Sequence, residues 1–262
     1  MNEFNFETIQ CEMKGRTLRI TLNRPKILNA INDIMLQEIR RALSWAVEHE
    51  EARAILIDAA GDRAFSAGID VKWVGKFTGT ESRESGRELH RTFLALRTTE
   101  MPIICAIDGL CLGAGLELAL SCDIMIATDR SQFGLPNIDR GIPAIVEAAI
   151  LPSAIGLQGA REMCFTGEFW SAEKAERRGL LHSVVTSENF QTEVESWCNK
   201  LSSKSVVGMA TQKEIIHKWM TTDLESAIDF SINTVMLAFE APDRKEAMAA
   251  FNEKRDAKLE GL

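Results

Sequence analysis

Residues 103–127 read IICAIDGLCLGAGLELALSCDIMIA, and this stretch decides the fold class. The apolar run from Ile103 to Ile107 predicts a buried strand that ends at Asp108-Gly109. A glycine-rich turn at Gly113 to Gly115 then leads into a helix-forming segment, and a second strand is predicted from Ile124 to Ala127. Because strands that alternate with helices form parallel sheets, the stretch predicts an α/β fold.

The same alternation extends towards the N-terminus. We predict a hairpin of residues 6–13 with 17–22, followed by an amphipathic helix at 32–47 that Asn32 caps. A strand at 54–57 and a second helix at 82–97 come next. A short strand-like run follows at residues 131–134.

The last hundred residues have a mainly helical pattern. Ser171 is a predicted N-cap, residues 183–185 form one short predicted strand, and helical periodicity restarts at Asn189, Val206, Leu224 and Asp243. We therefore divide the chain into an α/β core, residues 1–195, and a helical C-terminal subdomain, residues 196–262. No linker-like tract separates them, so the helices are expected to pack on the core or on another subunit.

Composition excludes several classes of protein. The 262 residues carry a formal net charge of -8, which gives no support to binding of nucleic acid or of anionic membranes. No apolar run approaches the ~18 residues of a membrane span, and the acidic N-terminus lacks the features of a signal peptide. We expect a cytoplasmic protein with free thiols, since no CxxC pair occurs among its six cysteines, Cys11, Cys105, Cys111, Cys122, Cys164 and Cys198.

Two glycine-containing turns, Ala64–Asp70 and Gly109–Glu117, each follow a predicted buried strand. Glycine permits a tight turn and leaves main-chain N–H groups uncovered, so the two turns could together form an oxyanion hole. They could equally be plain connections between a strand and a helix. Nucleotide binding has weak support, because neither a complete GxGxxG nor a GxxxxGK[ST] motif is present.

Other chemistries find less support in the sequence. The histidines (His49, His90, His182 and His217) are widely separated, so no metal site is expected. Ser66 lies in a turn but not in a GxSxG motif, which argues against a serine hydrolase.

Three N-terminal segments resemble, in order and spacing, the signatures of the enoyl-CoA hydratase/isomerase (crotonase) family: 22–26 with 29–30 (LNRPK, NA), 64–70 (AFSAGID) and 108–123 (DGLCLGAGLELALSCD). The similarity continues through 133–136, 141–143, 165–167, 175–180 and 251–255. It covers essentially the whole chain. The resemblance implies a spiral of ββα units followed by helices that build trimers, often paired into hexamers, and an acyl-CoA substrate with no dissociable cofactor.

The resemblance also implies roles for individual residues. The amides of Ala67 and Ala114 would hold the thioester oxygen, and Glu117 would be one of two catalytic glutamates. On the residues alone, Glu117 could instead be a solvated or capping carboxylate. The CoA and acyl path would be lined by Lys26, Ile27, Ala30, Ala64, Phe65, Gly68, Ile69, Asp70, Trp73, Gly113 and Pro136.

The chain departs from the family pattern at two places. Asn137 stands where a second catalytic glutamate is expected, and an amide can orient water but cannot transfer protons at neutral pH. Glu147 lies in an apolar run where many relatives have small residues, and it could supply the missing acid or base or be an exposed charge.

We therefore expect hydration of a 2-enoyl-CoA, with Glu117 activating water that Asn137 positions, and with Glu147 or a relayed proton completing the step. Double-bond isomerisation, thioester hydrolysis, a hydratase-lyase reaction and binding of acyl-CoA without catalysis are the alternatives.

Overall fold

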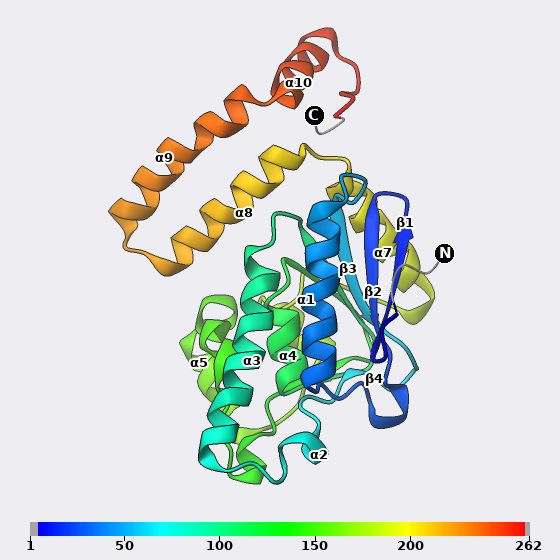
Figure 1. Cartoon of the computed structure of the whole chain (residues 1–262), viewed down its shortest axis with the longest axis vertical. Helices are drawn as coiled ribbons and strands as arrows, with labels where there is room; N and C mark the ends of the chain where they lie inside the picture. The colour runs from blue at the N-terminus through cyan, green and yellow to red at the C-terminus, as the bar shows by residue number, and fades with distance from the viewer. Residues whose placement is uncertain (1–4, 260–262) are drawn as a thin grey trace.

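The computed structural model describes residues 5–259, which form two β-sheets surrounded by helices (Figure 1). The larger sheet contains, in spatial order, β1 (Ile9–Lys14), β2 (Thr17–Leu22), β3 (Ala54–Ala59), β5 (Ile103–Ile107), β7 (Ile124–Thr128) and β10 (Ser183–Val185). The smaller contains β4 (Ala64–Ser66), β6 (Leu110–Leu112), β8 (Gln132–Gly134) and β9 (Trp170–Ser171). In the larger sheet only β1 runs antiparallel to its neighbour, which confirms the predicted α/β class.

The helices of the body are α1 (Asp33–Glu48), α2 (Val71–Val74), α3 (Gly79–Thr98), α4 (Ala114–Leu120), α5 (Leu151–Thr166), α6 (Ala172–Arg177) and α7 (Ser187–Ser202). Three short 3-10 helices are η1 (Pro25–Ile27), η2 (Ile138–Arg140) and η3 (Val146–Ile150). The predicted caps are confirmed: the side chain of Asn32 accepts from the Met35 amide, and that of Ser171 accepts from the Lys174 amide. Each cap satisfies an amide that the first helical turn leaves without a partner.

The larger sheet is apolar on both faces, as expected for parallel strands between helices. Alternate residues of β3, such as Ile55 and Ile57, point into the main core with α1 and α3. Their neighbours, Ala54 and Leu56, pack on the other face against Val194 of α7. This two-sided burial explains why the central strands are continuous apolar runs rather than alternating ones.

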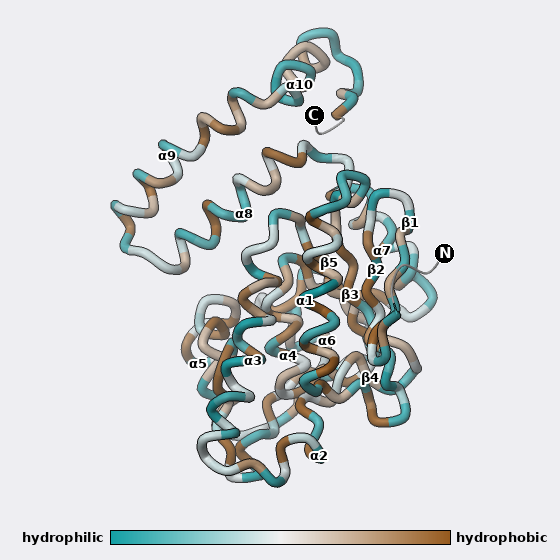
Figure 2. Tube along the Cα trace, in the orientation of Figure 1, coloured by the Kyte–Doolittle hydropathy of each residue, from teal (hydrophilic) through white to brown (hydrophobic). Residues whose placement is uncertain are grey.

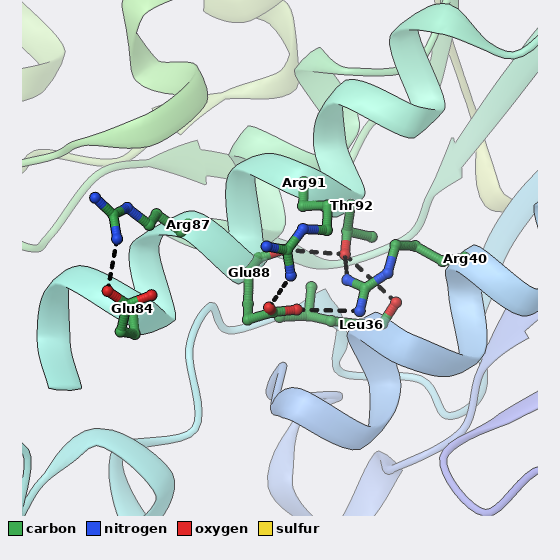
Figure 3. Close-up of polar contacts among 7 residues, drawn as sticks. All are labelled: Leu36, Arg40, Glu84, Arg87, Glu88, Arg91 and Thr92. Atoms are coloured by element: carbon green, nitrogen blue, oxygen red, sulfur yellow. Dashed lines mark hydrogen bonds and ion pairs between the residues drawn. The ribbon is translucent and has the colours of Figure 1, made fainter.

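Polar contacts fix α3 against α1 (Figure 3). Arg40 of α1 reaches Glu88 with an N–O distance of 3.0 Å and also donates to Thr92 Oγ1 at 2.5 Å. Glu88 is bonded in addition to Arg91 one turn later on α3. The face of α3 that looks towards α1 is therefore held in register by a partly buried network.

The C-terminal helices extend from the body as an arm made of α8 (Val206–Thr221), α9 (Leu224–Glu240) and α10 (Pro242–Glu253) (Figure 1). Lys213 anchors the base of the arm, because its Nζ donates to the Met101 carbonyl at 2.9 Å and to Asp123 Oδ2 at 2.6 Å. The domain boundary predicted between residues 195 and 196 lies inside α7, which packs on the sheet. The projecting part begins with α8.

The arm exposes many apolar side chains, and Figure 2 colours several positions along α8 and α9 as hydrophobic. On α9 the exposed apolar residues include Leu224, Ile228, Ile232, Val235, Met236, Leu237 and Phe239, with exposed fractions from 43% to 72%. A patch of this kind on a helix indicates contact with another surface. Within residues 5–259, no helix has both the length and the apolar character needed to cross a membrane.

Candidate active site

The two glycine turns of the sequence meet in the structure. They contain β4 and β6, which are parallel neighbours in the smaller sheet. Gly68 has a φ of +99°, and a Cβ added there would lie 3.0 Å from the carbonyl oxygen of Leu112 and 3.4 Å from the amide nitrogen of Ala114. A side chain at position 68 would thus meet the main chain of the second turn, so glycine is required for this close approach.

The Ala114 amide is one available donor at this junction. It begins α4, and within residues 5–259 its N–H has no hydrogen-bond partner, as expected for the first turn of a helix. Gly113 precedes it with a φ of +53°, and the Ala114 nitrogen lies 3.4 Å from where a Cβ on Gly68 would stand. The Ala114 N–H is therefore a candidate donor, and its role in an oxyanion hole stays a prediction.

The Ala67 amide does not fit its predicted role. Its N–H donates to the Leu28 carbonyl at 2.9 Å, so it is already used by the neighbouring chain segment. Along the same turn the amides of Gly68 and Asp70 also have acceptors. The Ile69 N–H is left without a partner in the part of the chain that the structure describes, and it replaces Ala67 as the candidate second donor.

Asn137 belongs to the same site. Its Oδ1 lies 3.5 Å from where a Cβ on Gly113 would stand, so the amide side chain reaches the second turn. Pro136 precedes it and is half-buried.

The residues predicted to line the ligand path separate into different environments. Lys26 and Ile27 are exposed on η1, whereas Ala30 and Ala64 are buried. Phe65 is wholly buried in the main core, so its side chain cannot line a path open to a ligand, and that prediction is corrected.

Asp70 has a structural task. It is 8% exposed, accepts from the Lys72 amide as the N-cap of α2, and pairs with Arg24 at 2.9 Å. Trp73 on α2 packs edge-on against Phe77, with ring centroids 5.7 Å apart. The capped helix α2 thus carries Trp73, and its partner Phe77 lies in the segment between α2 and α3.

Glu117, on the first turn of α4, is a buried carboxyl group with 3% of its surface exposed. Its Oε1 accepts one hydrogen bond, 3.2 Å long, from the Ala148 amide. The pKa of Glu117 is raised to about 8, because burial and then the charge of Glu147 raise it by more than the Ala148 hydrogen bond lowers it. A carboxyl group that releases its proton near neutral pH suits general acid and base chemistry. The solvated role is excluded by this burial.

Glu147 is also buried, with 2% of its surface exposed, which excludes the exposed-charge interpretation. Its Oε1 accepts from Arg97 Nη2 at 2.9 Å and lies 2.9 Å from His90 Nδ1. Both partners belong to α3. The sequence alone did not indicate that Arg97 and His90 bind Glu147. Their spacing of seven residues, which is two helical turns, places them on one face of a helix and was the available signal.

Comparison with known proteins identifies the family of the chain. A model of the enoyl-CoA hydratase/isomerase family matches residues 12–261. The chain belongs to the enoyl-CoA hydratase/isomerase family. Its relatives include the short-chain-enoyl-CoA hydratase of Clostridium acetobutylicum, 33% identical over 96% of each chain, and the crotonyl-CoA hydratase of Syntrophomonas wolfei, 32% identical over 96% of this chain and 97% of the relative. A crystal structure of an enoyl-CoA hydratase from Bacillus anthracis, 27% identical, superposes with a TM-score of 0.92 and covers 98% of this chain and all of that one. Family membership confirms the resemblance and the fold predicted from the sequence.

Proposed function

We propose that this member of the enoyl-CoA hydratase/isomerase family catalyses reversible addition of water to a 2-enoyl-CoA thioester. The observation that carries the proposal is the buried carboxyl group of Glu117 on the same short helix whose first amide, that of Ala114, is an open donor. The hydratase names of the two relatives above support the choice of reaction.

In the proposed reaction, ionised Glu117 accepts a proton from water as the water oxygen bonds to C3 of the substrate. The π electrons of C2=C3 move towards the carbonyl, and the thioester oxygen becomes an enolate oxygen. The amides of Ala114 and Ile69 would bind this oxygen, and fixed donors act most strongly where charge develops. Protonated Glu117 then transfers the proton to C2, which restores the thioester and the initial state of the carboxylate.

Asn137 would orient the attacking water through its carbonyl and amide groups, because it cannot take a proton itself. The scheme requires no dissociable cofactor, since CoA is part of the substrate. Lys26 and Ile27, exposed on η1, are proposed contacts for CoA. Trp73 is a proposed contact for the acyl chain.

Loss of the enoyl thioester absorbance in the presence of purified protein tests the proposal, with mass spectrometry to show the gain of one water. Glu117→Gln keeps the acceptor for Ala148 and removes the base, so turnover should disappear. Exposed Glu51→Gln is the control, and should retain wild-type rates. Full turnover by Glu117→Gln, or unchanged enoyl-CoA with the wild-type protein, would refute the scheme.

Double-bond isomerisation is the second candidate, and Asn137 is the observation that favours it. Moving a proton between C4 and C2 needs one carboxylate, which Glu117 supplies, and no second acid at position 137. Parallel assays with 2-enoyl, 3-enoyl and 3-hydroxyacyl thioesters separate the two reactions, and the same product analysis detects hydrolysis or carbon-chain cleavage.

We also propose that the arm formed by α8, α9 and α10 joins copies of the chain into a trimer or hexamer. The exposed apolar residues of α9 support this, and Ile232, which is 65% exposed, is a suitable probe. Light scattering should give the mass of a trimer or hexamer, and Ile232→Glu should lower it. A monomeric wild-type protein would contradict the proposal.

All six cysteines are free, in keeping with the expected cytoplasmic location.

A further inference from the structure

The side chains of Glu147, His90 and Arg97 form a cluster of polar contacts between η3 and α3. Glu147 lies on η3, and the two side chains within hydrogen-bond distance of its Oε1, those of His90 and Arg97, lie on the same face of α3. Arg97 is largely covered, whereas the His90 side chain is 53% exposed. The other carboxylate oxygen of Glu147 has no partner among the described residues, so Oε1 makes the hydrogen bonds of this carboxylate to α3.

The backbone that enters η3 needs such an anchor. Val146 has a φ of +30°, which is unfavourable for a β-branched residue. Conformations of this kind persist only where the surroundings hold them. The next residue is Glu147, whose buried ion pair supplies that restraint.

The η3 helix also contacts Glu117 through a main-chain hydrogen bond. The Ala148 N–H, which follows Glu147 directly, donates to Glu117 Oε1 at 3.2 Å. It is the only hydrogen bond to the Glu117 carboxyl group among the described residues. The placement of the proposed base therefore depends on a main-chain group whose position depends on Glu147.

On its other face α3 is a fixed support. Arg40 binds Glu88 and Thr92 there, as Figure 3 shows. A continuous series of contacts thus runs from α1 through α3 and Glu147 to the Ala148 amide and Glu117.

Charge couples the two glutamates as well. The titratable groups that face Glu117 are Glu147 from η3, whose charge raises its pKa, and Cys164 from α5, whose own pKa is raised by burial and then by the Glu117 charge. Glu147 faces His90 and Arg97 from α3. His217 of α8 lies within the field of Arg97, which helps burial to lower the His217 pKa.

We propose that Glu147 is a positioning residue, clamped by Arg97 and His90, that fixes the η3 turn and so holds Glu117 in place through the Ala148 amide. This inference rests on the proposed role of Glu117. It differs from direct proton transfer by Glu147, the role predicted from the sequence. In the clamped arrangement Glu147 acts through the turn and through its charge.

Four variants test the proposal through the pH dependence of kcat and KM. Glu147→Ala removes the clamp, so kcat should fall about 10- to 100-fold from misplacement of the base, with KM nearly unchanged. Glu147→Gln keeps the acceptor and removes the charge, so the plateau rate should stay within about threefold of wild type while the acid limb moves to lower pH. Arg97→Met leaves Glu147 less compensated and should move that limb to higher pH. Arg87→Met, an exposed change on the same helix outside the Arg40–Glu88–Thr92 contacts, is the matched control and should change neither kcat nor the acid limb.

A purely structural role of Glu147 would not move the acid limb in opposite directions in Glu147→Gln and Arg97→Met. The proposal is overturned if Glu147→Gln is as inactive as Glu117→Gln at every pH, because Glu147 would then transfer protons itself. It is also overturned if Glu147→Ala keeps the wild-type kcat and acid limb. Infrared difference spectra between wild type and Glu117→Gln follow ionisation of Glu117 without substrate. A shift in the pH midpoint of this ionisation in Glu147→Gln would support the charge coupling between Glu147 and Glu117, even if hydration were not observed. An unchanged midpoint would overturn the coupling.

Discussion

The buried carboxyl group of Glu117 predicts that stability depends on pH in a specific direction. Its pKa is raised from 4.5 to about 8 in the folded chain, so the folded state binds this proton more tightly than the unfolded state. The stabilising effect of protonation is complete below about pH 4.5 and is lost as the pH rises towards 8. Glu117→Gln cannot ionise, and its amide oxygen can still accept from Ala148, so this variant removes the pH-dependent term alone.

The raised pKa gives the magnitude. Each unit of difference between the folded-state and unfolded-state pKa of Glu117 corresponds to about 1.4 kcal/mol. Between pH 5 and pH 9 the wild-type protein should therefore lose about 4 kcal/mol of stability relative to Glu117→Gln. For a chain of this length that corresponds to a change of roughly 10 °C in the difference between the two melting temperatures.

Thermal unfolding of both proteins at pH 5 and pH 9, at one protein concentration, measures this change. Glu51→Gln serves as control, because the Glu51 side chain is exposed and its replacement should not alter the comparison. A difference between wild type and Glu117→Gln that is the same at both pH values would show that Glu117 ionises normally. The assignment of Glu117 as a base with a raised pKa would then be refuted.

Three further predictions concern activity and packing. Gly68→Ala, where a Cβ would lie 3.0 Å from Leu112 O, should lower kcat/KM about 10²- to 10³-fold with unchanged circular dichroism, whereas Gly79→Ala, which meets nothing within 4 Å, should not. Because only ionised Glu117 can accept a proton, kcat/KM should fall about tenfold per pH unit below pH 8, and a flat profile from pH 6 to 9 would contradict this role. Lys213→Met should destabilise the chain by about 1–3 kcal/mol in urea unfolding, because Asp123 loses its cation; an unchanged midpoint would show that the arm needs no anchor.

Regular elements were predictable because their patterns are local. The β5 strand has the predicted ends, and the caps Asn32 and Ser171 were identified from single side chains. Strands β4 and β6 were not predicted because their residues were assigned to the two glycine turns, and β9 has only two residues. Their pairing is decided by the sheet rather than by their own sequences.

The site was predictable only in part, for the same reason. The Ala114 amide is open because it begins a helix, and that is a local property. The Ala67 amide is closed by Leu28, nearly forty residues earlier, and no motif indicates which amide of a turn meets a distant carbonyl. Glu147 looked like an isolated acid in an apolar run, and only the fold brings Arg97 and His90 to it.

Burial of Glu117 explains why the chain needs a second buried acid that does not itself react. Loss of water raises the proton affinity of Glu117, but it also removes the solvent that would otherwise orient and satisfy the carboxylate. A single Ala148 amide replaces that solvent, and one hydrogen bond positions a base only if its donor is held. The ion pair of Glu147 with Arg97 supplies a rigid support, and the charge of Glu147 raises the pKa of Glu117 further. The Glu147 carboxylate can therefore place Glu117 and set its proton affinity without contacting the substrate.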